Sequence, residues 1–209
     1  MKGAFASLAT AVALGSPSAL ASNSFAPRAQ LESITVQGNA FFQGNNRFYI
    51  RGVDYQPGGS SEISDPLADA DGCRRDIAEF QKIGLNTVRV YTVDNSADHD
   101  ECMNALAQAG IYVVLDVNTP KYSLSRSDPD TSYNDVYLQN VFATVDMFAR
   151  YPNTLAFFSG NEVVNDAPSS QTAPYVKAVT RDMRSYMRAR KLRQVPVGYS
   201  AVSLYTSTT

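Results

Sequence analysis

The same order of elements, a helix, a glycine and an apolar strand, occurs twice in the middle of this 209-residue sequence. The segment DPLADADGCRRDIAEFQKIG has apolar residues at helical spacing and ends at Gly84, before the strand-like LNTVRVY. SADHDECMNALAQAG repeats that spacing and ends at Gly110, before IYVVLDV. Glycine is favoured immediately after a helix, so both helices are predicted to end there. The predicted inward faces carry Cys73, Ile77 and Phe80 in the first helix, and Cys102, Leu106 and Ala109 in the second.

The alternation of helices and strands continues on both sides of this repeat. Gly-Asn turns near the start predict a small hairpin that leads into a first core strand. Alternating strands and helices with nearly continuous apolar strands are typical of a parallel sheet. The further predicted elements are strands at Ile34–Val36, Tyr49–Asp54, Leu155–Ser159 and VPVGYS, and helices at Tyr133–Arg150, with Val141, Val145 and Phe148 on one stripe, and at about Pro174–Leu192.

Two architectures fit a parallel sheet of this kind. A doubly wound open sheet usually has a glycine-rich phosphate loop after its first strand, but VDYQPGGSSE contains no GxGxxG. A (β/α)8 barrel places functional groups at the carboxyl ends of its strands. Polar and aromatic residues recur at that position, which favours the barrel, with about the first five of its β/α units in this chain. These strand-end residues are Asp54, Tyr55 and Gln56, then Tyr91, then Asp116 and Asn118, then Asn161 and Glu162, then Tyr199 and Ser200.

The segment TLAFFSGNEV places Glu162 directly after an apolar strand. A carboxylate in an apolar setting is costly unless it is paired or neutralised, and carboxylates in such places often carry out proton transfer. The alternative is a capped strand end with Glu162 in solvent. In a barrel, Glu162 would lie at the mouth, where a substrate binds.

Tyrosines together with amides and carboxylates are typical of a sugar-binding site. Aromatic rings cover the C–H faces of sugars, while amides and carboxylates bind the hydroxyls. Cleavage of a glycosidic bond normally needs two carboxyl groups, and Glu162 is a good candidate for the acid. Asn161 could bind the sugar 2-hydroxyl. No second Glu at a later strand end is present in the chain.

Composition argues against several other classes of function. The formal net charge of −2 gives no indication of nucleic-acid binding, and the basic run Arg181–Arg193 fits the polar face of a helix. The single histidine, His99, lies near a helix start and is predicted to be exposed. With one histidine and no CxxC motif, neither a zinc site nor a cofactor is expected.

The first 21 residues have the pattern of a secretory signal peptide. Lys2 precedes the apolar GAFASLATAVALG, and the Ala19-Leu20-Ala21 site follows. Cys73 and Cys102 fit export, because secreted proteins oxidise such pairs, whereas in the cytosol they would more often be buried thiols.

Six motifs between about Ile34 and Ser200 resemble one enzyme family. They are FYIRGVDYQPGG, DPLAD with Cys73, NTVRVYTVDNSADHDECM, IYVVLDV, FFSGNEV and PVGYS. Their order resembles the catalytic domain of the fungal β-1,3-glucanosyltransferases, the cell-wall enzymes that remodel glucan. The resemblance implies a retaining (β/α)8 enzyme with β-1,3-glucan donor and acceptor chains as its partners.

The resemblance also implies roles for individual residues. Glu162 corresponds to the acid/base after the fourth barrel strand, and Asn161 to its sugar-binding neighbour. Tyr91 lies near the reacting sugar in this comparison, and Tyr55 and Gln56 are further candidate contacts with substrate. The implied donor-site contacts are Asp116 and the loop Asn118–Arg126. The family further implies a Cys73–Cys102 disulfide, an extracellular location and usually a GPI anchor.

The sequence departs from the family pattern at its C-terminal end. Family members place the nucleophilic Glu after the seventh strand, whereas five strands are predicted here. We therefore interpret residues 22–200 as the N-terminal part of the barrel and residues 201–209 as a divergent tail. Three functions stay open: glucan transglycosylation, glucan hydrolysis, and glucan binding without catalysis. The 209-residue chain alone is expected not to transfer glucan.

Overall fold

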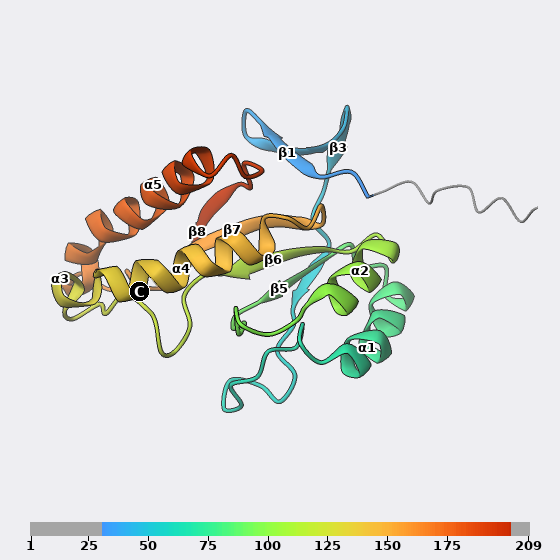
Figure 1. Cartoon of the computed structure of the whole chain (residues 1–209), viewed down its shortest axis with the longest axis horizontal. Helices are drawn as coiled ribbons and strands as arrows, with labels where there is room; N and C mark the ends of the chain where they lie inside the picture. Colours follow the sequence, from blue (N-terminus) through green and yellow to red (C-terminus); the bar gives the residue numbers. More distant parts are fainter. Residues whose placement is uncertain (1–30, 202–209) are drawn as a thin grey trace, which may run out of the picture.

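The computed structural model describes residues 31–201, which include a five-stranded parallel sheet (Figure 1). The strands pair in the order in which they occur in the chain, and every pair is parallel. A doubly wound sheet would reverse its strand order at a switch point, and this sheet has no reversal. The sheet is thus the first five strands of a (β/α)8 barrel, as predicted. The strands are β4 (Gly52–Asp54), β5 (Thr87–Val90), β6 (Tyr112–Asp116), β7 (Thr154–Asn161) and β8 (Val197–Ser200).

Four long helices pack on one face of this sheet. They are α1 (Ala70–Lys82), α2 (Asp100–Gln108), α4 (Asp135–Phe148) and α5 (Ala173–Ala189). Apolar residues at helical spacing turn toward the sheet, and Val141, Val145 and Phe148 of α4 are fully buried, as predicted. Gly84 and Gly110 follow the first two helices with φ of +73° and +75°, a conformation that glycine adopts without strain.

Side chains of each strand alternate between the two faces of the sheet. In β5, Val88 and Val90 belong to the core shared with the helices. In β6, Tyr112 and Val114 lie on the other face, the inner face of the barrel, in a second apolar cluster. Because alternate residues point to opposite faces, Arg89 and Asp116 also lie on the inner face.

An antiparallel meander covers the end of the sheet where the strands begin (Figure 1). It comprises β1 (Ile34–Gln37), β2 (Ala40–Gln43) and β3 (Asn46–Phe48). Ile34 and Phe48 pack with Tyr112, the first residue of β6. The predicted hairpin thus has a third strand, and the carboxyl ends of the parallel strands lie away from it.

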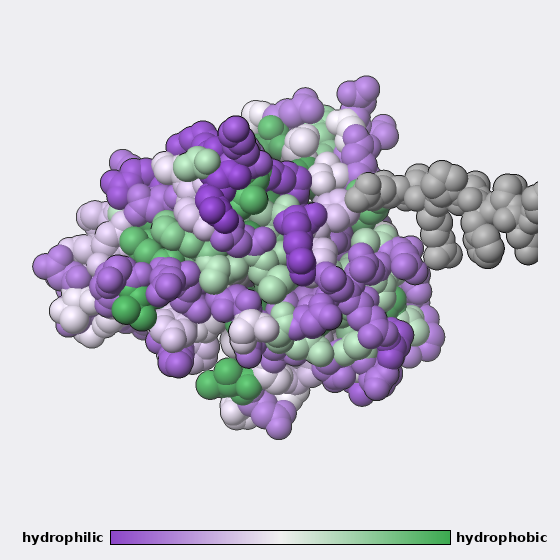
Figure 2. Space-filling model, in the orientation of Figure 1, coloured by the Kyte–Doolittle hydropathy of each residue, from purple (hydrophilic) through white to green (hydrophobic). Residues whose placement is uncertain are grey.

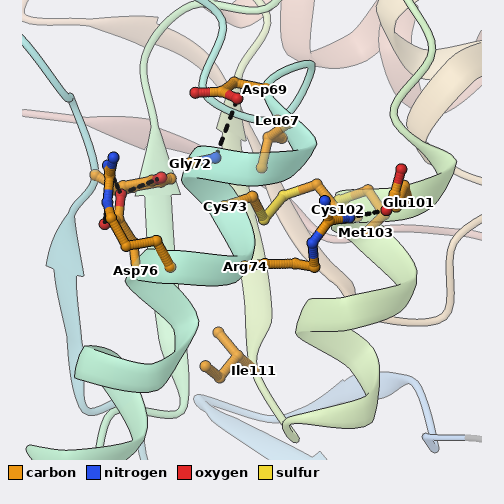
Figure 3. The surroundings of a disulfide bond; sticks show 12 residues. Leu67, Asp69, Gly72, Cys73, Arg74, Asp76, Glu101, Cys102, Met103 and Ile111 are labelled. Atoms are coloured by element: carbon orange, nitrogen blue, oxygen red, sulfur yellow. Dashed lines mark hydrogen bonds and ion pairs between the residues drawn. A yellow bond between two sulfur atoms is a disulfide. The ribbon is translucent and has the colours of Figure 1, made fainter.

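A disulfide joins the first two helices, as predicted. Cys73 of α1 and Cys102 of α2 are bonded, with 5.8 Å between their Cα atoms (Figure 3). Next to the bond, Arg74 forms an ion pair with Glu101. Asp69 caps α1 by accepting a hydrogen bond from the Gly72 amide at 3.0 Å. The bond and the ion pair both hold the starts of the two helices together.

The first core strand is shorter than the predicted Tyr49–Asp54, because β4 begins at Gly52. The Asn86 side chain bonds the backbone before it, accepting from the Arg51 amide and donating to the Tyr49 carbonyl, both at 2.8 Å. These side-chain bonds act beside a backbone bond from the Asn86 amide to the Arg51 carbonyl at 2.9 Å. The short helices α3 (Pro129–Ser132) and η1 (Pro168–Thr172) lie in loops and were not predicted.

The prediction that His99 is exposed is wrong, because its side chain is 0% exposed. Its Nε2 lies 2.7 Å from Asp65 Oδ2, and its ring packs against Phe148. The loop after β4 folds over the start of α2 and brings Asp65 to the imidazole, a contact that the local sequence around His99 does not indicate.

Over the helices, the surface in Figure 2 is largely hydrophilic, with small hydrophobic patches. Among residues 31–201, none of the helices combines the length and apolarity needed to cross a membrane. The predicted signal peptide and nearly all of the predicted tail lie outside the described residues.

Candidate active site

The carboxyl ends of the strands bring Arg89, Asp116 and Asn161 together. Arg89 Nη2 and Nε donate to the two carboxylate oxygens of Asp116, at 2.8 and 3.1 Å. Arg89 Nη2 also donates to Asn161 Oδ1 at 3.0 Å. A guanidinium binds a carboxylate best in this two-point geometry, so three neighbouring strands, β5, β6 and β7, share one polar cluster.

Aromatic rings and a second carboxylate surround the Arg89 guanidinium. Its central carbon lies 4.2 Å from the ring centre of Tyr91 and 4.8 Å from that of Phe158. Arg89 Nη1 lies 3.9 Å from Asp54 Oδ1, which extends the cluster to β4. Cations are stabilised over aromatic faces, and this packing fixes the guanidinium in one plane.

Burial changes the acidity of two groups in the cluster. Burial raises the pKa of the Asp116 carboxyl, and the hydrogen bonds and charge of Arg89 offset that rise only in part. Burial also raises the pKa of the Tyr91 phenol, and its hydrogen bond with Asp54 adds to the rise. Tyr91 is therefore a neutral hydroxyl at physiological pH, available to donate or accept hydrogen bonds.

Glu162 follows the last residue of β7 and lies at the surface beside this cluster. Its φ is +48°, a left-handed conformation that costs a residue with a side chain roughly 1–2 kcal/mol. The pairing of β7 with β8 shifts register between Phe158 and Asn161, immediately before it. Such irregularities commonly re-aim side chains next to active sites.

The polypeptide on both sides of Glu162 is tightly packed. At Gly160 an added Cβ would lie 3.1 Å from Val163 and 3.2 Å from the Tyr199 ring. The Tyr199 hydroxyl accepts a hydrogen bond from the Val164 amide at 2.9 Å. Tyr199, a predicted strand-end residue, thus supports the turn that contains Glu162.

Two predicted substrate contacts point toward the helices. Tyr55 is 7% exposed, and its hydroxyl donates to Asp76 of α1 at 2.8 Å. Asn118 Oδ1 accepts a hydrogen bond from the Tyr137 hydroxyl of α4 at 2.6 Å. Gln56 is exposed at the start of the loop after β4. The structure therefore joins Tyr91, Asp116 and Asn161 through Arg89, and it does not bring Tyr55 or Asn118 into that group.

Two hollows lie near the carboxyl ends of the strands, and Arg89 of the cluster lines one of them. A smaller one of about 340 Å³ lies on the inner face of the sheet, between Asp54, Arg89 and Phe158. A groove of about 840 Å³ lies between the loops after β4, β5 and β6, and it includes part of the predicted donor-site loop. Polar side chains and Tyr122 line this groove, a composition that suits an extended hydroxylated ligand. Residues of the groove include Asp65, Asp94, Asn95, Lys121, Tyr122 and Asn140.

Arg89 connects the cluster, and sequence reasoning missed it. A signal was present, because Arg89 interrupts the apolar strand LNTVRVY at a position that alternates with Val88 and Val90. A charged side chain on an otherwise buried strand needs a partner. Within residues 31–201, His, Cys, Asp and Glu side chains form no group of three or more able to hold a metal ion.

Comparisons with known proteins identify the family of the chain. A family profile described as Glucanosyltransferase matches residues 23–207. The 1,3-beta-glucanosyltransferase gel1 of Aspergillus fumigatus is 68% identical over 197 residues, which are 94% of this chain and 44% of that protein. The 1,3-beta-glucanosyltransferase GAS5 of Saccharomyces cerevisiae is 60% identical over 188 residues, 89% of this chain and 38% of that protein.

A solved structure shows the same fold. Saccharomyces cerevisiae Gas2p in complex with laminaritriose and laminaritetraose superposes with a TM-score of 0.77 at 39% identity, over 82% of this chain and 39% of that one. The chain spans less than half the length of these relatives. The profile match over most of the chain and the 68% identity to gel1 lead to one conclusion: this chain belongs to the glucanosyltransferase family.

Proposed function

We propose that this chain supplies the proton-donor part of a 1,3-β-glucanosyltransferase, which cleaves and rejoins β-1,3-glucan chains with retention of configuration. The observation that carries this proposal is the cluster of Arg89, Asp116 and Asn161 directly beside Glu162, at the carboxyl edge of a barrel sheet. Functional groups of this fold lie at that edge.

Glu162 is the general acid and base of the proposed reaction. Its carboxyl proton passes to the glycosidic oxygen as the bond from that oxygen to the anomeric carbon breaks. A second carboxylate, which family members carry after the seventh barrel strand, forms a covalent bond to the same carbon. The 3-hydroxyl of an acceptor glucan then displaces that carboxylate and gives its proton to Glu162, which restores the enzyme.

Asn161 orients the sugar undergoing reaction. Its Oδ1 accepts a hydrogen bond from Arg89, so its Nδ2 is the group that remains to donate to the sugar 2-hydroxyl. A bond to that hydroxyl strengthens as the transition state forms. Arg89 therefore fixes the direction of the Asn161 amide.

The remaining contacts extend the site along the strand ends. The Tyr91 ring and hydroxyl lie next to Arg89 at the reacting sugar. Asp116 holds Arg89 in place, and Gln56 with the loop that begins at Asn118 borders the donor side. Tyr55 supports the end of β4 through its bond to Asp76.

We place the protein outside the cell, at the cell wall. The N-terminal signal pattern and the Cys73–Cys102 disulfide support export, since disulfides persist in oxidising compartments. Complete members of the family are expected to be held at the plasma membrane by a GPI anchor.

The test uses an extended protein, in which this chain up to Ser200 continues into the remaining C-terminal part of the Aspergillus fumigatus relative. Incubation with laminari-oligosaccharides should give products longer than the substrate. Shorter products alone would identify a hydrolase, and binding without any product would identify a non-catalytic glucan-binding protein.

Substitution of Glu162 tests its role in the same extended protein. Glu162→Gln should leave oligosaccharide binding intact and lower turnover by about 10²–10⁴-fold, the usual contribution of a general acid–base group. Glu79→Gln on the exposed side of α1 is the matched control and should keep full turnover. A near-normal rate for Glu162→Gln would contradict the proposal.

A further inference from the structure

Glu162 is one of two non-glycine residues with positive φ in the described part of the chain, the other being Lys191. Strained backbone of this kind persists only where surrounding contacts hold it. The contacts around Glu162 therefore show what holds its main chain in this conformation at the end of β7.

Two hydrogen bonds hold the main chain of Glu162 from opposite sides. Its amide donates to the Ser200 carbonyl of β8 at 2.9 Å. Its carbonyl accepts from Arg126 Nη2, also at 2.9 Å. The Ser200 bond belongs to the sheet, whereas the Arg126 bond comes from the loop between β6 and α3, 36 residues earlier in the chain.

Arg126 is itself tied to the segment that follows Glu162. Its carbonyl accepts a hydrogen bond from the hydroxyl of Thr172, a fully buried residue at the start of α5. The loop after β6 and the loop after β7 are thus joined twice: once through the Arg126 guanidinium and once through its main chain.

We propose that Arg126 is a positioning residue for the proton donor. The guanidinium bonds the main chain of Glu162 and thereby stabilises the left-handed turn from which the carboxylate projects. This inference rests on the proposed role of Glu162 as acid and base. It assigns Arg126 a function different from the sugar contact that the family resemblance implies.

The two roles predict different kinetics. A sugar contact made equally in the ground state and the transition state changes KM and leaves kcat unchanged. Loss of a positioning contact misplaces the reacting group, and a displacement of about 1 Å can cost about 100-fold in rate. A change in kcat without a change in KM thus distinguishes positioning from binding.

The first experiment measures transfer kinetics of Arg126→Gln, Arg126→Lys and Arg184→Gln in the extended protein. Arg184 is the matched control, because its Nη2 donates to the Val197 carbonyl at 3.1 Å, on the same sheet but away from Glu162. We expect Arg126→Gln to lower kcat by about 10- to 100-fold with KM within about twofold. Arg126→Lys keeps a charged donor and should recover part of kcat, and Arg184→Gln should keep kcat within about twofold.

The second experiment does not depend on activity. Hydrogen–deuterium exchange of the 209-residue chain should show faster exchange at the Glu162 and Val164 amides in Arg126→Gln, but not in Arg184→Gln. If the extended protein transfers no glucan, the proposed function fails while this exchange measurement still judges the positioning contact.

Three results would overturn the inference. The first is an increase in KM at unchanged kcat, which would make Arg126 a sugar contact. The second is an equal loss of kcat in the Arg126→Gln and Arg184→Gln variants, which would indicate general destabilisation. The third is unchanged amide exchange at Glu162 in Arg126→Gln.

Discussion

The two faces of the parallel sheet differ in how fully they are covered. On the helix side, Val113, Leu115 and Phe157 are completely buried beneath four helices. On the inner face, Val114 and Phe158 border an open apolar groove of about 670 Å³. The interior of a closed (β/α)8 barrel is filled with side chains. Stability of the described chain therefore comes mainly from the helix side of the sheet. The groups proposed for chemistry lie on the inner face and along the carboxyl edge of the sheet.

We expect the largest difference in the free energy of unfolding between alanine variants of two neighbouring phenylalanines of β7. Phe157 faces the helices and is fully buried, whereas Phe158 lines the open groove. Phe157→Ala should lower the free energy of unfolding by about 3–5 kcal/mol, the usual cost of removing a buried aromatic side chain. Phe158→Ala should cost clearly less, because part of its ring is already in contact with solvent. Urea denaturation of both variants gives the values, and equal losses would show that the inner face is packed as well as the helix side.

The disulfide joins two helices on the helix side of the sheet, so its removal tests how much that side contributes to stability. Cys73 and Cys102 are 29 residues apart, and a loop of this size corresponds to about 3–4 kcal/mol in the chain-entropy account. The Cys73→Ser/Cys102→Ser double variant should lose about that much stability in urea denaturation. Alkylation without reductant, followed by mass spectrometry, should find both thiols protected in the parent chain, and two alkylated cysteines would disprove the bond.

The smallest expected effect is a difference between the two faces in how the free energy of unfolding depends on pH. Burial raises the pKa of Asp116 on the inner face. The hydrogen bond from Arg75 lowers the pKa of Asp76 on the helix side, and the bond from Tyr55 lowers it further. The two carboxyl groups should therefore contribute to stability with opposite slopes.

Proton linkage gives the direction in which each carboxyl group changes stability with pH. Asp116 contributes stability that is fully present below its unfolded pKa, near 3.9, and is lost as pH rises through its raised folded value. Asp76 contributes stability that is present above its unfolded pKa and is lost as pH falls through its lowered folded value. Urea denaturation at several pH values should show that Asp116→Asn removes the loss of stability with rising pH. Asp76→Asn should remove the loss of stability with falling pH. Parallel pH profiles for the two variants would contradict this assignment.

Sequence predicted the repeating framework well, because its signals are local. Gly84 and Gly110 end their helices, and Cys73 and Cys102 lie on inward helical faces, as the spacing of apolar residues indicates. The position of Glu162 at a strand end followed from the apolar run before it. The spacing of apolar residues indicates these features, because each depends only on residues within one helical turn or one strand.

Features that depend on distant contacts could not be predicted in the same way. Arg89 meets Asp116 and Asn161 across separations of 27 and 72 residues. Tyr55 turns toward α1, and His99 is buried by the loop that carries Asp65. Side-chain direction at a strand end depends on which neighbour offers a hydrogen-bond partner, and only the tertiary structure determines that.

The order of the strands has a consequence for how the chain acquires its fold. From β5 on, each strand of the sheet pairs with the strand made immediately before it, so each pairing can form as soon as its second strand has been synthesised. During synthesis, the N-terminal parts of a protein fold first. The first two β/α units, including both cysteines, can thus form while the rest of the polypeptide is still being made, the meander packs on the sheet once Tyr112 of β6 has been added, and each completed unit becomes the template on which the next strand is added.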